Sequence, residues 1–349
     1  MLSASDDDLL GLPKAELHVH LDGSLRPATM LELARERGGR LPEREAEALA
    51  RRMLVTGATR LEEYLEPFRI TLSLLQDAPA LERAAYELAE DHAAENVRYV
   101  EVRFCPALST ERGLAADEVL DAVLAGLARA RRDHGIESRV IVCALRTLPP
   151  AASREMAELA VAYQDRGVCA FDLAGAEAGY PVHDHLEAFR LAEAAGLGIT
   201  IHAGEGFGTP SIQEALELAH ATRIGHGTRL GEDPELLERV RDAGIPLEVC
   251  LTSNVQTRVA PSYEEHPVRR YFDEGVRVCL CTDNRLMSGV TLTDEYRRAR
   301  DALGFTGEEL AQVARTAFAC AFLPEEARRG LLEGFDAATE RDVGTSPQV

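Results

Sequence analysis

The stretch Pro13-Lys14-Ala15-Glu16-Leu17-His18-Val19-His20-Leu21-Asp22-Gly23 places two histidines one residue apart at the end of an apolar, strand-like run. In a β-strand, side chains at positions i and i+2 point to the same face of the sheet. His18 and His20 can therefore reach into one cavity and hold one metal ion between them. The stretch predicts a first β-strand whose end carries part of a metal site.

Apolar, mostly β-branched runs recur along the chain, and longer helical patterns separate them. The eight expected strands are 15–20, 97–104, 138–145, 168–174, 198–203, 222–226, 246–252 and 276–282. This alternation implies parallel strands joined by right-handed helical crossovers. Eight units favour closure into a (β/α)8 TIM barrel, and an open, doubly wound sheet is the alternative.

The remaining segments extend this α/β plan within one domain of residues 1–349, a length that barrels commonly use. Residues 26–94, between the first two strands, are far more than one crossover needs, and we expect inserted helices there, over the barrel mouth. Additional helices at about 306–340 would pack outside the barrel. Residues 1–11 and 343–349 are expected to be flexible ends.

Composition excludes several classes of protein. Hydrophobic residues make up 46% and charged residues 28%, as in soluble globular proteins, and no apolar run approaches the roughly 18 residues of a membrane helix. The net charge of −21 disfavours nucleic acid, whose phosphates need Lys and Arg, and favours a neutral or cationic small molecule. The acidic N-terminus lacks the basic region of a signal peptide, which favours a cytoplasmic protein. The seven scattered cysteines predict buried free thiols, and no pattern indicates an oligomeric state.

Polar side chains recur where the expected strands end. They are His18 and His20 on the first strand, His202 and Glu205 at the fifth, His226 on the sixth and Asp283 after the eighth. A single histidine at a strand end is more often structural than a ligand, but several arriving independently are hard to obtain by chance. Because barrel enzymes build their active sites at the carboxyl ends of the strands, this distribution favours the barrel over the open sheet.

The grouping calls for a metal ion, and imidazole with carboxylate suits zinc. The expected ligands are His18, His20, His202 and Asp283. A catalytic zinc site leaves one position open for water and lowers the pKa of that water to about 7. Glu205, in the turn His-Ala-Gly-Glu-Gly, can face the substrate and deliver a proton. The chain's single lysine, Lys14, precedes the first strand, which excludes a two-metal site bridged by a carboxylated lysine.

Six motifs resemble, in order and spacing, those of the adenosine deaminase family. They are Pro-Lys-Ala-Glu-Leu-His-Val-His-Leu-Asp-Gly-Ser at 13–24, Asp-Leu-Ala-Gly at 172–175, His-Ala-Gly-Glu at 202–205, Gly-His-Gly-Thr at 225–228, Thr-Ser-Asn-Val-Gln-Thr at 252–257 and Cys-Thr-Asp-Asn at 281–284. The resemblance spans roughly residues 12–325 and implies a barrel with one zinc ion. It also implies conversion of a 6-aminopurine nucleoside, first adenosine or 2′-deoxyadenosine, to the 6-oxo product and ammonia.

The same resemblance implies roles for individual residues. The catalytic residues that it implies are Glu205, His226 and Asp283. Glu205 would protonate purine N1, and His226 would orient and deprotonate the water. The implied substrate-binding residues are His20, Asp22 at the ribose, Gly175 with its backbone N–H at N3, and Asn284 at N7. Many family members have aspartate at the position of Asn284. An asparagine amide can donate to an unprotonated N7 without carrying an acidic proton.

Several alternatives stay open. Asn284 and the following Arg285 keep another 6-aminopurine possible, such as aminodeoxyfutalosine, adenine or an N6-substituted nucleotide. Arg285 would then meet an acidic group of the substrate, or it forms an ordinary surface ion pair. A non-catalytic signalling relative would be expected to lose Glu205 or a metal ligand, and the missing bridging lysine disfavours a phosphotriester or amide hydrolase.

Other aromatic residues and histidines have competing interpretations. Tyr64, Leu65 and Phe68 form either a lid over the ribose or the packing face of an inserted helix. His183 and His185 repeat the H-x-H spacing, but at a helix start, where residues i and i+2 diverge, so we expect them to face solvent or to cap the helix. The histidines expected to be structural are His92, His134, His220 and His266.

Overall fold

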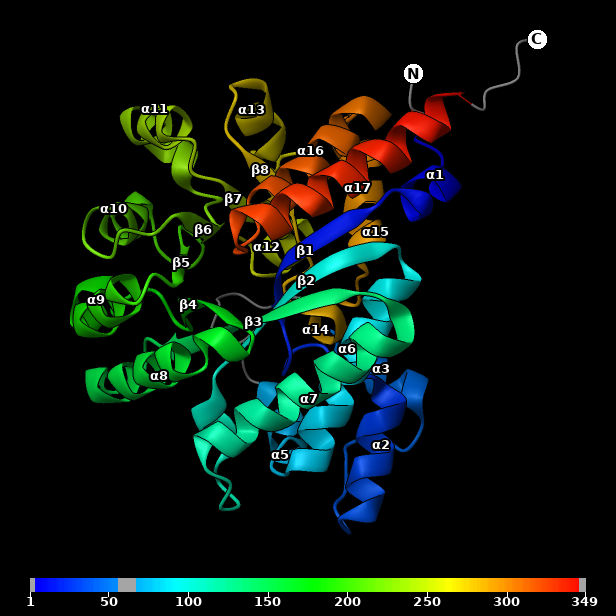
Figure 1. The fold of residues 1–349 in the computed structure, drawn as a ribbon, viewed down its shortest axis with the longest axis vertical. Helices are drawn as coiled ribbons and strands as arrows, with labels where there is room; N and C mark the ends of the chain where they lie inside the picture. The colour runs from blue at the N-terminus through cyan, green and yellow to red at the C-terminus, as the bar shows by residue number, and fades with distance from the viewer. Residues whose placement is uncertain (1–3, 56–66, 345–349) are drawn as a thin grey trace.

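The computed structural model describes residues 4–55 and 67–344, and its centre is a barrel of parallel strands. Eight strands are hydrogen-bonded in the order β1-β2-β3-β4-β5-β6-β7-β8 (Figure 1). The segment just after the last strand meets the first strand through a parallel bridge between Val19 and Asp283. The expected (β/α)8 TIM barrel is therefore confirmed, and the open sheet is excluded.

The strands begin and end close to their expected positions. They are β1 (Lys14–His20), β2 (Val97–Phe104), β3 (Glu137–Leu145), β4 (Val168–Ala174), β5 (Gly198–Ala203), β6 (Arg223–His226), β7 (Leu247–Val249) and β8 (Val278–Leu280). The seventh and eighth are shorter than the apolar runs predicted. After Val249 the chain turns at once into helix α12 (Leu251–Gln256), so the apolar residues of that run are buried in a helix rather than in the sheet.

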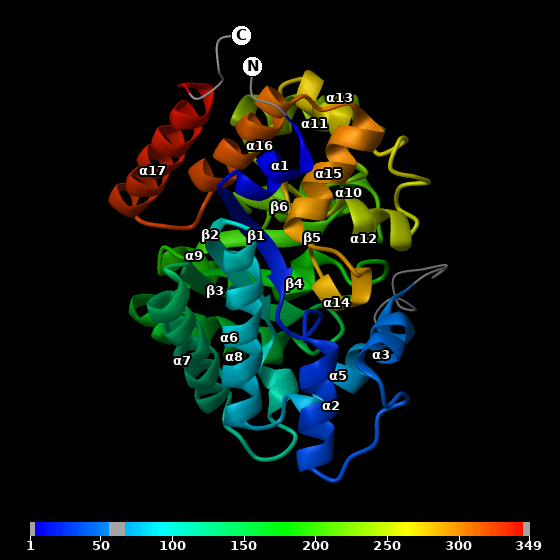
Figure 2. The ribbon, with the colours of Figure 1, turned by 90° about the vertical axis from the view of Figure 1, so that its right-hand side faces the viewer.

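A helix precedes each strand from β2 to β8 and covers the outside of the barrel. These helices are α6 (Ala78–Ala94), α7 (Ala116–His134), α8 (Pro150–Ala162), α9 (Leu186–Ala194), α10 (Thr209–Glu217), α11 (Pro234–Ala243) and α13 (Val268–Asp273). The chain ends with α14 (Arg285–Ser288), α15 (Leu292–Leu303), α16 (Gly307–Ala319) and α17 (Glu325–Gly344). The additional C-terminal helices are thus confirmed, and α17 lies along one side of the molecule (Figure 2).

The long segment between β1 and β2 contains the expected inserted helices. They are α2 (Pro27–Glu36), α3 (Ala46–Met53) and α5 (Phe68–Leu74), which lie together at one end of the molecule (Figures 1 and 2). Phe68 and Leu72 of α5 line a cavity at the barrel mouth. Of the three residues considered as a lid, only Phe68 can be placed, because Tyr64 and Leu65 lie outside the described residues.

Residues 6–11, within the expected flexible N-terminal end, form helix α1 (Asp6–Gly11). Ser5 caps this helix by accepting a hydrogen bond from the backbone of Asp8, and three aspartates in its first turn suit the positive end of the helix dipole. Lys14 Nζ donates to the carbonyls of Leu9 and Leu12 at 2.7 and 2.8 Å, so its charge caps the opposite end. At the C-terminus, α17 continues to Gly344.

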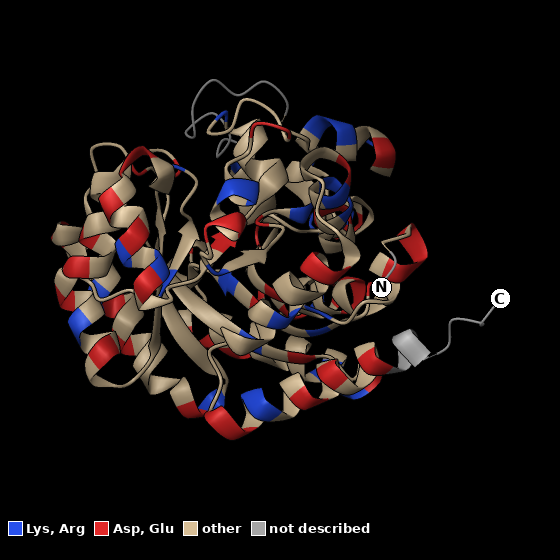
Figure 3. Cartoon of the chain, turned by 90° about the horizontal axis from the view of Figure 1, so that it is seen from above, with Lys and Arg blue, Asp and Glu red and all other residues tan. Residues whose placement is uncertain are grey.

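The charged residues lie mainly on the outer helices, where acidic and basic side chains are interleaved, and the strands carry few of them (Figure 3). All seven cysteines are free; five are buried, as expected, but Cys169 and Cys320 are partly exposed. Among the described residues, no helix combines the length and the apolar character needed to cross a membrane.

Candidate active site

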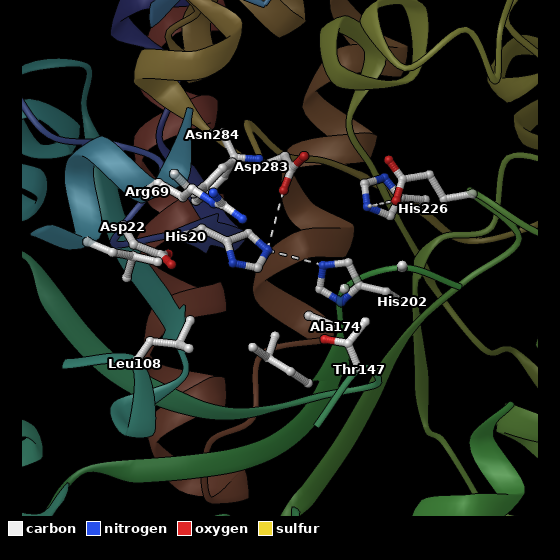
Figure 4. A pocket seen from close by; sticks show the side chains of 16 residues that line it. His20, Asp22, Arg69, Leu108, Thr147, Ala174, His202, His226, Asp283 and Asn284 are labelled. Carbon is white, nitrogen blue, oxygen red and sulfur yellow. Dashed lines mark hydrogen bonds and ion pairs between the residues drawn. The ribbon is translucent and has the colours of Figure 1, made fainter. Parts of the chain in front are cut away.

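A cavity of about 370 Å³ opens at the carboxyl ends of the strands. His20, His202 and His226 reach it from β1, β5 and β6, and Asp283 reaches it from the turn after β8 (Figure 4). Closure of the barrel brings these distant residues together. The backbone N–H of His20 donates to Asp283 O at 2.7 Å, and the N–H of Asp283 donates to His18 O at 2.8 Å.

The spacing of the side-chain atoms in this cavity fits one metal ion. Asp283 Oδ1 lies 3.4 Å from His18 Nε2 and 3.4 Å from His20 Nε2, and His20 Nε2 lies 3.1 Å from His202 Nε2. Ligand atoms arranged tetrahedrally about zinc at its usual distances are separated by about 3.3 Å. His18 Nε2 is buried and has no hydrogen-bond partner among the described residues, as expected of a nitrogen whose lone pair binds a metal. His18, His202 and Asp283 therefore lie close enough to share one ion, and His20 Nε2 lies beside the atoms of His202 and Asp283.

A fourth histidine lies in the same place. One ligand atom from each of His18, His202, His226 and Asp283 lies within 4.8 Å of all the others, so distance alone does not separate His226 from the ligands. His226 is 1% exposed and has a φ of 63°, a backbone conformation that is rare outside glycine. Such backbone strain is common at functional sites.

Buried carboxylates orient two of the imidazoles. His18 Nδ1 lies 2.9 Å from Glu248 Oε2, and His202 Nδ1 lies 3.1 Å from Asp172 Oδ1. Arg103 donates to both carboxylates, at 2.8 Å to Glu248 and 3.0 Å to Asp172. Although burial opposes ionisation, the nearby positive charge of Arg103 helps to hold the pKa of Glu248 well below its usual value. An ionised carboxylate only accepts, so each Nδ1 carries the proton and each Nε2 lone pair faces the cavity.

Glu248 and Arg103 were not predicted as partners of the site. Both are fully buried on strands whose neighbouring residues are apolar. Because a buried charge must be paired, a charged residue inside a predicted buried strand indicates that it has a partner in the core. The sequence does not show which residue such a buried charge contacts, because His18 and Glu248 are 230 residues apart along the chain.

The carboxylate behind His202 provides a test of this arrangement. We expect Asp172→Asn to weaken metal affinity by about 10–100-fold, the usual cost of losing such an outer partner, because the neutral amide supports His202 less well. Competition with a chromophoric chelator measures the affinity, and circular dichroism verifies folding. The exposed Asp121→Asn variant is the matched control. An unchanged affinity in Asp172→Asn would show that this contact does not tune the site.

Glu205 is the buried acid of the cavity. Its Oε2 lies 3.6 Å from His226 Nε2, and its side chain is 6% exposed. Burial raises the pKa of Glu205 well above its usual 4.5, and the negative charges of Asp283 and Glu177 raise it further. These causes favour the protonated form of Glu205, as a proton donor requires.

The loop that carries Glu205 is held by Glu177, another residue that the sequence analysis missed. The Glu177 carboxylate accepts hydrogen bonds from the backbone N–H groups of Gly204, Glu205 and Phe207 at 2.6, 3.0 and 2.8 Å. Gly204 has a φ of 72°, and a Cβ there would lie 2.5 Å from Ile212 Cδ1, so this turn requires glycine. Three bonds to one carboxylate keep the acid at a constant position.

The residues expected to bind substrate also line the cavity. Asp22, Gly175 and Asn284 do so together with His20. Burial raises the pKa of Asp22 to about 6. Asp22 and Asn284 lie on the side of the cavity where His20 lies (Figure 4).

Arg285 does not reach the cavity. Its Nη1 donates to Glu95 Oε1 at 2.6 Å, and its side chain is 12% exposed. Arg285 therefore forms an ion pair, as one of the two alternatives predicted, but this pair is mostly buried rather than on the surface. The arginine that does line the cavity is Arg69 of α5 (Figure 4), which the sequence analysis did not single out.

The second H-x-H pair is not part of the site. His183 is exposed and pairs with Glu214, as expected of a solvent-facing histidine. His185 is instead 3% exposed, and its Nδ1 lies 2.8 Å from Ser153 Oγ, so the expectation that it faces solvent or caps the helix is wrong. The short helix Val182–His185 turns its side chain toward α8.

A (β/α)8 barrel with four imidazoles, an aspartate and a buried acid at its mouth defines a metal-dependent hydrolase. The family model described as adenosine deaminase matches residues 13–338. The chain belongs to the adenosine deaminase family.

Individual proteins support this assignment. An adenosine deaminase of Mycobacteroides abscessus is 44% identical to this chain over 92% of the chain and 93% of its own length. A probable adenosine deaminase of Dictyostelium discoideum is 42% identical over 89% of the chain, which spans 40% of that longer protein.

Solved structures with the same fold act on related compounds. An adenine deaminase from Arthrobacter aurescens superimposes with a TM-score of 0.88 and 28% identity, covering 94% of this chain and 99% of its own. The N6-methyl-AMP deaminase from Arabidopsis thaliana superimposes with a TM-score of 0.85 and 30% identity, covering 97% of this chain and 100% of its own.

Proposed function

We propose that this chain is a single-domain enzyme that deaminates a 6-aminopurine nucleoside, with adenosine or 2′-deoxyadenosine as substrate and inosine or 2′-deoxyinosine plus ammonia as products. The observation that carries the proposal is the buried acid Glu205, 3.6 Å from His226 and in the same cavity as the metal-ligand group. Relatives named adenosine deaminase over nearly their whole length support it.

One zinc ion per chain fits the donor set of His18, His20, His202 and Asp283. Three imidazole nitrogens and one carboxylate oxygen are ligands that zinc prefers, and the set contains no thiolate. When bound there, zinc supplies a water molecule whose pKa is lowered to about 7.

The chain's own residues complete the reaction. Glu205 places its proton on purine N1, which draws electron density from C6 while the water oxygen forms a bond to that carbon. The C6–N6 bond then breaks, and the amine leaves as ammonia with one proton from the water. The other water proton restores Glu205, so the acid is unchanged after each turnover.

Substrate contacts follow from the residues that line the cavity. Asp22 faces the ribose hydroxyls, the backbone N–H of Gly175 faces N3, and the Asn284 amide donates to N7. His20 contacts the substrate from the metal side. The apolar part of the wall is Phe68, Leu72, Leu108 and Leu145. A cavity of about 370 Å³ is within the usual size range of small-ligand sites.

Arg69 supports a second candidate, a 6-aminopurine nucleoside 5′-monophosphate. This exposed arginine lines the cavity and forms no ion pair or hydrogen bond with the part of the chain that the structure describes. A guanidinium pairs well with phosphate oxygens. The solved structure named N6-methyl-AMP deaminase has the same fold and acts on a nucleotide.

A substrate panel decides between these candidates. Ammonia release is measured with adenosine, 2′-deoxyadenosine, adenine, AMP, N6-methyl-AMP and aminodeoxyfutalosine, with and without a chelator. We expect the highest kcat/KM for the two nucleosides and loss of activity on chelation. A nucleotide preference that disappears in Arg69→Ala would establish the second candidate instead, and a preference for adenine would overturn both.

A further inference from the structure

We propose that His266 and Asn254 are positioning residues that keep the ring proton of His226 on Nε2, so that His226 donates a hydrogen bond to the attacking water instead of removing its proton. The inference rests on the proposed function and specifies how His226 acts in it. It replaces the deprotonating role that the family resemblance implied for His226.

The chain of hydrogen bonds begins at His266, just before α13. The backbone N–H of Val268 donates to His266 Nδ1 at 3.1 Å. A backbone N–H can only donate, so Nδ1 is the accepting nitrogen and a neutral His266 carries its proton on Nε2. His266 is 3% exposed, and burial lowers its pKa to about 3, which keeps the ring neutral.

Asn254, in α12, accepts a hydrogen bond from that N–H and is oriented by it. Its Oδ1 lies 3.1 Å from His266 Nε2 and accepts a second hydrogen bond from Thr228 Oγ1 at 2.8 Å. With two donors at Oδ1, the amide nitrogen must face the other way, where Nδ2 lies 3.1 Å from His226 Nδ1. An amide NH₂ group only donates, so His226 Nδ1 accepts. Asn254 is fully buried, so water does not compete for these positions.

A neutral His226 ring carries a single N–H proton, on either Nδ1 or Nε2. With Nδ1 accepting, a neutral ring carries its proton on Nε2, the nitrogen that lies 3.6 Å from Glu205 Oε2. That nitrogen belongs to a side chain lining the cavity, so its N–H can hold the oxygen of a water molecule there. Its lone pair is used in the N–H bond and is not available to take a proton from the same water.

The same reasoning separates the histidines that distance alone does not separate. His18 and His202 have a carboxylate at Nδ1, from Glu248 and Asp172, which leaves Nε2 free to bind a metal. His226 has an amide donor at Nδ1, which makes Nε2 a hydrogen-bond donor. The partner behind each of these three rings therefore assigns the ring either to the metal or to the water.

The direct test is the ring-nitrogen NMR spectrum of His226 in zinc-loaded protein labelled with ¹⁵N-histidine. The expected result is a protonated Nε2 and an unprotonated Nδ1, with the signals assigned by their loss in His226→Gln. A proton on Nδ1 would overturn the proposal. The NMR measurement requires no turnover, so it can contradict the tautomer proposal even when the proposed function is correct. The substrate panel tests the proposed function.

A kinetic test uses Asn254→Asp, which has the same shape but presents a carboxylate to His226 Nδ1. We expect the proton to move to Nδ1 and kcat to fall by about 10²-fold or more at unchanged zinc content, since a wrong histidine tautomer is costly. KM should change little. An unchanged kcat, or an unchanged tautomer in the NMR spectrum, would contradict the proposal.

Substitutions at His266 keep the test valid if Asn254→Asp does not fold. We expect His266→Gln, whose amide can still donate to Asn254, to retain more of kcat than His266→Leu, which cannot. His185→Gln and His185→Leu are matched controls at a buried histidine outside the site, and neither should change the His226 spectrum. Equal kcat values in His266→Gln and His266→Leu would assign His266 a purely structural role.

Discussion

Replacing Glu205 with glutamine is expected to lower kcat by about 10²–10⁴-fold, the usual contribution of a general acid, while the metal stays bound. Glutamine has nearly the same size but has no acidic proton to place on the substrate. Steady-state kinetics with adenosine measures the loss, and metal analysis measures occupancy. Glu193→Gln, at an exposed position, is the matched control. Wild-type turnover in Glu205→Gln would eliminate Glu205 as the acid.

The pH dependence follows from the same residue. Because burial raises the pKa of Glu205 well above 4.5, the acid keeps its proton to a higher pH than an ordinary glutamic acid does, and kcat should fall as pH rises through that raised pKa. Stability should change in the same direction. Between the ordinary pKa of 4.5 and the raised one, the folded state holds a proton that the unfolded state has lost, so the free energy of unfolding decreases with rising pH. Glu205→Gln should lack this contribution, and chemical denaturation at several pH values would reveal it.

The second large effect is expected from His18→Ala, which should lose the metal and with it all measurable deamination. Removing an outer partner already costs about 10–100-fold in affinity, and removing a ligand should cost more. The substitution also leaves Glu248 without one of its partners. Metal analysis after dialysis measures occupancy, and the exposed His220→Ala is the control. Full occupancy in His18→Ala would refute the ligand assignment.

Thermal unfolding adds an independent readout for the same variant. A ligand that binds only the folded state stabilises it by about 4 kcal/mol when present at 1,000 times its Kd. A chelator should therefore lower the Tm of the wild type and of His220→Ala. It should leave the Tm of His18→Ala unchanged, because that variant has no bound metal to remove. An equal decrease in all three proteins would contradict the assignment.

Most of the fold was predictable because its signals are local. Each strand is a short apolar run, each crossover is a longer helical pattern, and their alternation implies a parallel barrel. The exceptions show where local signals end. Residues 6–11 looked like a solvated acidic tail, but the Ser5 cap and the distant contact from Lys14 make them a helix. The run after Val249 is apolar because a helix buries it, which periodicity cannot distinguish from a short strand.

For the candidate site, features that depend on residues close together in the sequence were predictable, and features that depend on distant residues were not. The i, i+2 spacing of His18 and His20, the small residues around Glu205 and the glycines around His226 are local patterns, so the sequence by itself determined that these four side chains gather at the barrel mouth. What each of them does there depends on the group behind it. Glu248 lies 230 residues from His18, and Asn254 lies 28 residues from His226. Only the tertiary structure decided these pairs, because a hydrogen bond is made within about 3 Å in space and no spacing along the chain specifies that contact.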